Sequence, residues 1–411
     1  MANTPNIRFK GFHDEWEQRK LNEIANKVIE KNKSNEFSEP FTNSAELGIV
    51  SQKDYFDREV VNQENLDGYY IVRNDDFVYN PRISVTAPVG PINRNRLGRN
   101  GVMSPLYTVF RTHGIDNLYL EFYFKTTSWH RFMKLNGDSG ARFDRFTISS
   151  TQFMEMPIPF PNKEEQRKIG EHFDNLDHFI TLHQHKYDEM KQLKKFMIQK
   201  MFPKSGEQVP EIRFAGFTGD WEQRKLGEIT NILSASRVHK EEWKTEGVPF
   251  FRSSDVMAAF KGTKNDKVFI SQELFEKLSA ISGKPQQGDI FITGGGSIGT
   301  PYIVPNNEPL YSKDADLIWV KKGEKHDSFY LYSYFVSPIF REYLLSISHT
   351  GTIAHYTIEQ VKKTPVFFPS LEEQQKIGVY FSNLDHLITL HQHKCDELQG
   401  VKKFMLQNMF V

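Results

Sequence analysis

EEQRKIGEHFDNLDHFITLHQHKYDEMKQLKKFMIQKMF, residues 164–202, recurs at residues 372–410 as EEQQKIGVYFSNLDHLITLHQHKCDELQGVKKFMLQNMF, and 27 of the 39 aligned positions are identical. Mostly apolar residues recur in each copy with alternating spacings of four and three. The pattern lasts for about five heptads and predicts a coiled-coil seam along a long helix. The seam positions are Ile169, Phe173, Leu176, Ile180, His183, Tyr187, Met190, Lys194, Met197 and Met201 in the first copy, and Ile377, Phe381, Leu384, Ile388, His391, Cys395, Leu398, Lys402, Met405 and Met409 in the second.

The two predicted helices are expected to pair with each other, because neither can bury its apolar stripe alone. Asn162 with Glu165, and Ser370 with Glu373, match the capping box that begins a helix. An antiparallel pair suits a repeat whose copies are related by a two-fold axis. The seam histidines would lie near the middle of that pair, where a polar residue more often fixes the register than forms a functional site.

A shorter repeat precedes each insert between the copied segments. Residues 7–24, IRFKGFHDEWEQRKLNEI, match residues 212–229, IRFAGFTGDWEQRKLGEI, at 13 of 18 positions. The inserts, residues 26–161 and 231–369, resemble each other only weakly. A copied scaffold with diverged inserts indicates one architecture that presents two different surfaces. We expect the blocks with Trp16 and Trp221 to lock each domain to the other half's helix.

Each insert has the pattern of a mixed α/β domain. Strand-like runs at 77–79, 106–110, 289–293 and 317–320 are separated by Gly, Pro and Asn, and aromatic-rich helical patterns cover 118–132 and 329–345. The predicted fold is α+β, with two mixed α/β domains in a pseudo-two-fold arrangement, separated by a pair of long antiparallel coiled-coil helices. The predicted division is 1–161 for the first domain, 162–203 for the first helix, 204–211 for a linker, 212–369 for the second domain and 370–411 for the second helix.

The composition is that of a globular protein rather than a disordered one, and 411 residues suffice for two domains. No apolar run approaches the ~20 residues that span a bilayer. The N-terminal residues lack the basic-then-apolar order of a secretory signal. With Cys395 as its single cysteine, the chain can form no internal disulfide, and we expect a cytoplasmic location.

Catalytic and metal-binding motifs are incomplete. Tyr79-Asn80-Pro81-Arg82 is similar to the Asn-Pro-Pro-aromatic tetrapeptide of amino-methyltransferases but lacks its second proline and its aromatic, so a turn into a DNA-facing loop is favoured. Residues 294–300, GGGSIGT, lack the lysine of a phosphate-binding P-loop and predict a tight loop with exposed amides. Histidines two apart on a helix point to different faces, which is poor chelating geometry. We therefore assign no catalytic residue and no metal ligand.

Positive charge is concentrated locally, although the chain carries 52 basic and 52 acidic residues. Residues 77–115 contain no Asp or Glu. Guanidinium groups among Ser, Thr, Asn and Gly suit contacts with phosphates and guanine edges, and a solvated basic face is the alternative. The candidate DNA-binding residues are Arg82, Arg94, Arg96, Arg99, Arg142 and Arg145 in the first half, and Arg252, Ser297, Lys313, Thr352 and His355 in the second.

The complete double pattern resembles the specificity subunit of a type I restriction-modification system. The resemblance is carried by the IRFxGFxxxWEQRKLxEI repeat, the duplicated heptad helices and the Pro-x-x-x-Glu-Gln-x-x-Ile-Gly entry that begins at Pro161 and again at Pro369. It covers essentially the whole chain. It implies two target recognition domains held apart by two antiparallel helices, and a bipartite, asymmetric target in double-stranded DNA. Individual base contacts do not carry over, because the recognition loops vary within the family.

The resemblance also implies partners. Two methyltransferase (modification) subunits would dock on this chain, and restriction/translocase subunits would join through them. Methyltransferase and endonuclease activities, with S-adenosylmethionine, ATP and Mg²⁺, would reside in those partners, so this subunit would be non-catalytic and without a cofactor. Candidate subunit-binding residues recur off the seam in both copies, and packing against the recognition domains is their alternative role: Leu182, Phe196, Leu390 and Phe404.

Two competing functions are distinguishable. A freestanding scaffold could bind two different proteins through its two inserts, and an adjacent gene for an intact methyltransferase would argue against that. A catalytic DNA enzyme would need activity from this chain alone, which the motifs do not support.

Overall fold

The computed structural model describes residues 4–56, 66–139, 144–313, 317–347 and 355–411. The chain forms two compact units. The first unit comprises residues 1–183 and 393–411, and the second comprises residues 184–392. Each unit therefore contains one insert and a segment of both long helices. The predicted division into domains and helices stays a prediction, and the two units are described separately below.

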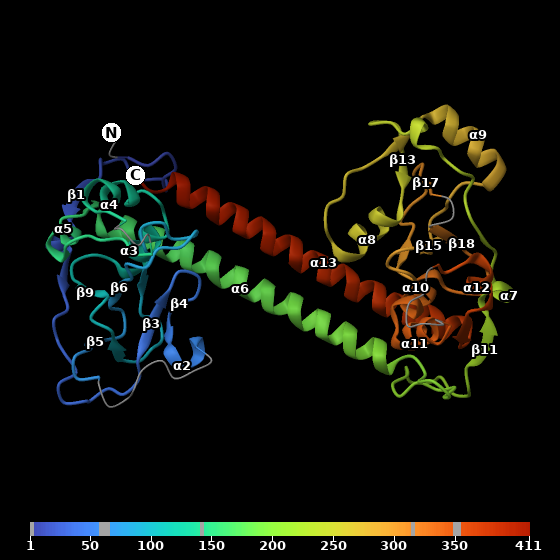
Figure 1. Cartoon of the computed structure of the whole chain (residues 1–411), viewed down its shortest axis with the longest axis horizontal. Coiled ribbons are helices and arrows are strands. Elements are labelled where there is room, and N and C mark those ends of the chain that lie inside the picture. The colour runs from blue at the N-terminus through green and yellow to red at the C-terminus, as the bar shows by residue number, and fades with distance from the viewer. Residues whose placement is uncertain (1–3, 57–65, 140–143, 314–316, 348–354) are drawn as a thin grey trace. The chain divides into compact units, whose positions relative to one another are not determined.

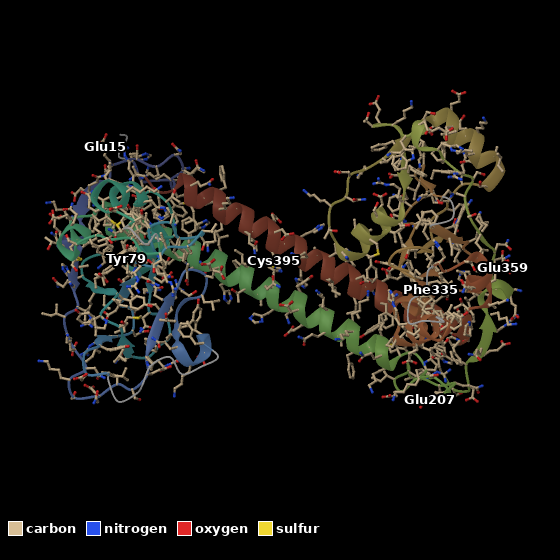
Figure 2. The ribbon with its side chains drawn as sticks, in the orientation of Figure 1. Glu15, Tyr79, Glu207, Phe335, Glu359 and Cys395 are labelled. Carbon is tan, nitrogen blue, oxygen red and sulfur yellow. The ribbon has the colours of Figure 1, made fainter. Side chains whose placement is uncertain are left out.

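The two long helices are confirmed as α6 (Lys163–Lys200) and α13 (Leu371–Asn408). Every predicted seam position is buried or half-buried, whereas the flanking positions are mostly exposed. Cys395, labelled in Figure 2, lies in the seam on α13 and donates its thiol hydrogen to the carbonyl of Ile180 on α6. A sustained 4-3 spacing thus produced the predicted coiled-coil packing.

Contacts within each unit show that the helices run antiparallel (Figure 1). In the first unit, Phe173 stacks on Phe410 with ring centroids 5.8 Å apart, and Asp177, one turn further along α6, pairs with Lys402, which lies earlier on α13. In the second unit, Lys194 pairs with Asp385. Both ion pairs join a seam lysine to an aspartate, and the 208-residue offset of the repeat relates one pair to the other.

The first unit is built around a four-stranded antiparallel sheet in the order β2-β9-β6-β7, with α3, α4 and α5 beside it. The two-stranded sheets β3-β4 and β5-β8 extend this domain, and β1 pairs with β10 next to α6. The element bounds are β1 (Glu17–Lys20), α1 (Leu21–Ile24), β2 (Ala25–Lys27), β3 (Phe41–Ser44), β4 (Gly48–Ser51), α2 (Gln52–Tyr55), β5 (Tyr70–Val72), β6 (Phe77–Tyr79), β7 (Ile92–Arg94), β8 (Gly101–Met103), β9 (Thr108–Thr112), α3 (Asn117–Phe124), α4 (His130–Asn136), α5 (Ser150–Met154) and β10 (Pro157–Phe160).

The second unit repeats this plan with the sheet β12-β18-β15-β16 and the strand pair β11-β19. The second unit also has a three-stranded sheet, β14-β13-β17, whereas the first unit has the two-stranded sheets β3-β4 and β5-β8. The element bounds are β11 (Glu222–Lys225), α7 (Leu226–Ile229), β12 (Ile232–Leu233), η2 (Lys240–Glu242), β13 (Val248–Phe251), α8 (Ser253–Lys261), β14 (Phe269–Ile270), α9 (Gln272–Ser282), β15 (Ile290–Thr293), β16 (Pro301–Ile303), β17 (Tyr311–Ser312), β18 (Leu317–Val320), α10 (Ser328–Val336), α11 (Pro338–Ser346), α12 (Ile358–Lys363) and β19 (Pro365–Phe368).

Each of the two helices predicted within the inserts is interrupted. The predicted helix 118–132 is α3 followed by α4. The interruption lies where the hydroxyl of Thr126 and the indole N–H of Trp129 donate hydrogen bonds to carbonyls at the end of α3. The predicted helix 329–345 is α10 followed by α11. Pro338 has no N–H to continue the helical hydrogen bonds, so a new helix begins there.

The copied N-terminal blocks contact both long helices. The amide of Ile7 donates to the carbonyl of Asn408 on α13 at 2.9 Å, and that of Ile212 donates to Lys200 on α6 at the same distance. These bonds agree with the prediction that each block reaches the other half's helix. Trp16 itself does not follow this prediction. Its indole N–H donates at 3.2 Å to Glu165 on α6, the helix of its own half.

Candidate nucleic-acid interface

Two loops occupy equivalent places in the two units. Residues 80–91 connect β6 to β7, and residues 294–300 connect β15 to β16. The base of each loop is held by one backbone hydrogen bond of 2.7 Å, from Phe146 to Pro81 in the first unit and from Tyr356 to Gly294 in the second. We call these the first-unit loop and the second-unit loop. They share a position in the fold but no sequence.

The Tyr79-Asn80-Pro81-Arg82 motif forms the start of the first-unit loop, as the turn interpretation predicted. The side chain of Asn80 accepts from the amide of Arg82 at 2.9 Å and donates to the carbonyl of Asn43 at 2.7 Å. Tyr79 is buried, its hydroxyl donates to the carbonyl of Val89, and burial raises its pKa. These side chains are occupied in shaping the loop rather than in presenting a reactive group.

The first-unit loop brings two cations together. Arg82 forms a strand-like bridge with Arg145, and the amide of Ile83 donates to Asp144 at 3.1 Å. Arg82 is exposed and has no ion pair among the described residues, where Arg145 has Asp144 at 3.9 Å. Like charges on directly opposed residues repel each other. Arg82 and Arg145 therefore remain candidates for contact with a DNA phosphate.

The tip of this loop exposes an apolar side chain that the sequence did not single out. Val85 is 102% exposed and stands between the hydroxyl residues Ser84 and Thr86. A methyl-bearing side chain flanked by hydroxyls can contact a thymine methyl group and neighbouring base edges. The only hint in the sequence is the position of Val85 among polar residues in a stretch without acids.

The second-unit loop presents backbone and small polar groups. Gly296 and Ser297 are exposed, and Gly296 adopts a φ of 68°, which favours glycine. The carbonyl of Ser297 accepts from the hydroxyls of Thr293 and Thr300, which closes the loop. His355 is exposed, next to the Tyr356 that anchors the loop. Ser297 and His355 thus lie in the same part of the unit, as candidates for contact with DNA.

Three of the predicted DNA-contacting arginines instead form intramolecular ion pairs. Arg94, 11% exposed, bonds Glu121 and Asp75 at 2.8 and 3.0 Å. Arg96 bonds Glu121 and Asp174. Arg99 makes two 2.8 Å bonds with Glu39.

The acid-free stretch 77–115 is therefore not free of acidic neighbours in the folded chain. Arg94, Arg96, Arg99 and Arg111 pair with carboxylates outside the stretch, whereas Arg82 has no such partner among the described residues. Contact of Arg94, Arg96 and Arg99 with DNA stays a prediction.

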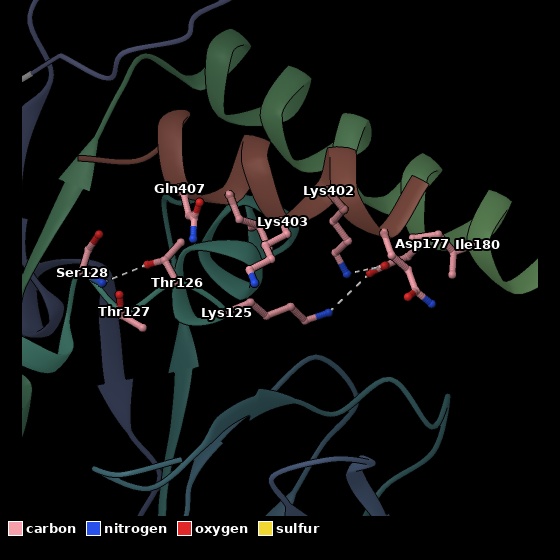
Figure 3. Close-up of a pocket in the computed structure, with 11 residues that line it drawn as sticks. Lys125, Thr126, Thr127, Ser128, Asp177, Ile180, Lys402, Lys403 and Gln407 are labelled. Atoms are coloured by element: carbon pink, nitrogen blue, oxygen red, sulfur yellow. Dashed lines mark hydrogen bonds and ion pairs between the residues drawn. The ribbon is translucent and has the colours of Figure 1, made fainter. Parts of the chain in front are cut away.

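The buried carboxylate of Glu121 belongs to a network that joins the first insert to the helix pair. Lys125, at the end of α3, reaches Asp177 at 3.5 Å, and Asp177 also pairs with Lys402 (Figure 3). Lys125, Asp177 and Lys402 line a cavity of about 570 Å³, together with Lys403. Burial lowers the pKa of Lys402, and the Asp177 carboxylate opposes that shift. The network is structural, and it adds to the packing that holds the insert on the helices.

The remaining predicted residues are placed as follows. Arg252 is half-buried and bonds Asp255 and the carbonyl of Asp266, so it is also used internally. Lys313 is half-buried beyond β17 and makes an interaction of its own. Arg142 and Thr352 lie outside the described residues.

Known proteins match the chain over most of its length. The family described as the type I restriction modification DNA specificity domain matches residues 13–192 and 218–399. The chain belongs to this family.

Individual relatives agree with that assignment. The chain is 24% identical over 329 residues to the type I restriction enzyme MjaVIII specificity subunit of Methanocaldococcus jannaschii, covering 75% of this chain and 73% of the relative. It is 25% identical over 252 residues to the putative type I restriction enzyme specificity subunit S.HindORF215P of Haemophilus influenzae, covering 60% of each. The crystal structure of the type I restriction-modification system S subunit from M. genitalium shares the fold, with a TM-score of 0.61, 14% identity and 99% coverage of both chains.

Membership in the family makes the chain a specificity subunit of a type I restriction-modification system, and such subunits are non-catalytic. Specificity subunits act on DNA in complexes with other subunits of these systems. Among the described residues, no cluster of three His, Cys, Asp or Glu side chains could hold a metal ion. No helix in the described part of the chain is long and apolar enough to cross a membrane.

The specificity subunit exposes apolar side chains at matching positions on both long helices. The four predicted subunit-binding residues are between 43% and 56% exposed, so they are not buried against the inserts. Leu182 and Phe404 belong to the first unit, and Phe196 and Leu390 to the second. Each unit therefore presents one leucine and one phenylalanine from equivalent repeat positions.

Proposed function

We propose that this specificity subunit reads a bipartite, asymmetric target in double-stranded DNA, one half through each unit. The observation that carries the proposal is the pair of equivalent loops with unrelated sequences. The first-unit loop offers Arg82 and Val85 with Arg145 bridged to it, and the second-unit loop offers Ser297 and glycine amides with His355 beside its anchor. Two readers built on one scaffold with different contact groups select different base sequences.

The contact groups suit different parts of DNA. Exposed arginines bind phosphates or the O6 and N7 acceptors of guanine, whereas Val85 suits a thymine methyl. Readers that use the same face of B-DNA are spaced about one turn, ~10 bp, centre to centre. With half-sites of three to five base pairs, that spacing leaves an unread gap of about six base pairs. The antiparallel helix pair would set this gap.

We further propose that two methyltransferase subunits dock on the exposed apolar residues of the helices, and that restriction/translocase subunits join through them. The repeat relation of Leu182 to Leu390, and of Phe196 to Phe404, supports two copies of the same partner. S-adenosylmethionine, ATP and Mg²⁺ would be bound by those partners and not by this chain. The cytoplasm, where chromosomal DNA is accessible, is the location that this function requires.

Selection of duplexes from a random DNA pool by the full chain tests the reading function. We expect two short, unlike conserved segments separated by an unread gap of constant length. A palindromic consensus or one uninterrupted segment would contradict the proposal. A pool recovered without any consensus would show that this chain alone does not discriminate between sequences.

Capture of the system's methyltransferase subunit tests the docking surface. A variant with Phe196→Ala and Phe404→Ala should capture less of it than wild type does. Phe329→Ala is the matched control, because Phe329 is a similarly exposed phenylalanine, 42%, outside the long helices. Undiminished capture by the double variant would remove this surface from the proposal.

A further inference from the structure

The cation of the second-unit loop comes from an element that the sequence did not connect with it. Arg341 lies on α11, and its Nη1 donates to the carbonyl of Ile298 at 3.0 Å. The loop itself contains no charged residue. Tertiary folding therefore adds a guanidinium to a loop that otherwise offers only amides and hydroxyls.

Arg341 has no carboxylate partner among the described residues. The half-buried or exposed arginines Arg8, Arg94, Arg99, Arg111, Arg213 and Arg252 each bond a carboxylate. Arg341 is half-buried, and its hydrogen bond within the described part of the chain goes to a neutral carbonyl. Burial lowers its pKa, since removing a cation from water without a counter-charge is unfavourable. Arg82, in the equivalent loop of the first unit, also has no ion pair with the residues that the structure describes.

The second-unit loop supplies neutral donors beside this cation. The amides of Thr293, Ile298 and Gly299 donate to backbone carbonyls in and beside the loop, and the amide of Thr300 donates to the hydroxyl of Thr293. The amides of Gly295, Gly296 and Ser297 make no backbone hydrogen bond within the described residues, and this segment is at the surface. Consecutive amides in a turn with a left-handed residue form a concave site for an anion.

We propose that Arg341 and the amides of residues 295–297 bind one phosphate of the DNA backbone in the second half of the target. This inference rests on the proposed function. A guanidinium donates two parallel hydrogen bonds to a phosphate, and Arg341 keeps Nε and Nη2 for that purpose while Nη1 holds the loop. The contact is sequence-independent and fixes the register of the second reader on the duplex.

Salt-dependent binding to the selected duplex, by the full chain, tests this assignment. Arg341→Gln should lower the affinity about tenfold for the target and for base-substituted duplexes alike. The slope of log affinity against log salt concentration should decrease by about one, because one counterion fewer is released. Arg341→Lys keeps the charge and should retain most of that slope while losing the paired hydrogen bonds.

Arg224→Gln is the matched control. Arg224 lies on β11 in the same unit, is 35% exposed and faces the carboxylates of Glu222 and Glu228. Its removal should leave the salt slope unchanged. Gly296→Ala tests the amides, because a Cβ there meets nothing within 4 Å and only the left-handed backbone is disfavoured. This variant should weaken binding without altering the charge.

Neutral methylphosphonate linkages, placed one at a time along the selected duplex, identify the phosphate. One position should weaken binding by wild type and have no further effect on Arg341→Gln. If no position shows this coupling and the salt slope of Arg341→Gln equals that of wild type, the assignment is overturned while the reading function stands. If wild type itself does not prefer the selected duplex over a scrambled one, the proposed function fails.

Discussion

At the scale of single residues, the sequence showed where arginines are concentrated but not which carboxylates pair with them. The partners of Arg94, Arg96 and Arg99 lie 19 to 78 positions away in the chain. Local composition cannot reveal such distant pairs. Arg82 and Arg145 were predicted, and the structure brings them together across a bridge. Val85 and Arg341 were missed, because exposure and the lack of a partner are tertiary properties.

His326 provides a prediction at this scale. It is 5% exposed, its Nδ1 has no partner, and burial lowers its pKa to about 4. Because the folded pKa lies below the unfolded value, protons bind the unfolded state more tightly. The stabilisation is complete above the unfolded pKa and is lost as the pH falls toward 4. Between pH 7.5 and pH 5 the free energy of unfolding should fall by about 2 kcal/mol from this group.

His326→Ile is the variant for that measurement, because Ile115 occupies the equivalent place before the N-cap aspartate in the first unit. Urea unfolding at both pH values should show a smaller pH effect in the variant by that amount. His130 and His172, whose pKa values burial also lowers, remain in both proteins and cancel in the comparison. An equal pH effect in both proteins would show that His326 is accessible to protons in the folded state.

At the scale of elements, periodicity predicted the long helices well. The observed ends, Lys163–Lys200 and Leu371–Asn408, lie one to three residues inside the predicted ones. The seam positions include Lys194 and Lys402, and the structure gives each of them an aspartate partner on the opposite helix. The inserts were harder to predict, because single residues end their helices. The indole of Trp129 bonds a carbonyl at the end of α3, and Pro338 lacks the N–H that would continue α10.

The seam ion pairs should be worth a measurable amount. Asp177→Asn leaves Lys402, 18% exposed, facing a neutral group, and should lower the free energy of unfolding by about 1–2 kcal/mol. Replacing both partners, with Lys402→Leu and Asp177→Asn, should recover that loss because leucine suits the seam. Thermal unfolding of the single and double variants measures both effects. If Asp177→Asn is as stable as wild type, the ion pair fixes the register of the two helices without adding to the free energy of unfolding.

The helix pair as a spacer gives a second prediction at this scale. Removing one heptad from the middle of each helix, residues 183–189 and 391–397, shortens each helix by about 10 Å. The unread gap should shrink by about three base pairs, while both half-site sequences stay the same. Duplex selection by the shortened chain measures the gap. Altered half-sites with an unchanged gap would refute the spacer role.

At the scale of the whole molecule, duplication explains why the family was recognisable while the target is not. Each copied N-terminal block contacts the start of its own half's long helix and the end of the other half's, so its sequence is constrained by packing. The loops between β6 and β7 and between β15 and β16 are anchored at their bases and closed by a few local hydrogen bonds, most of which use backbone groups. Their tips are free to differ, and a difference there changes the DNA sequence that is read without changing the fold.

Independence of the two readers is the central claim, and exchanging one insert tests it most directly. Residues 26–161 are replaced by the corresponding insert of another specificity subunit, and the target of the chimera is determined by duplex selection. We predict that one half-site changes completely, while the other half-site and the gap length remain those of the wild-type target. A change in both half-sites, or in neither, would contradict the account.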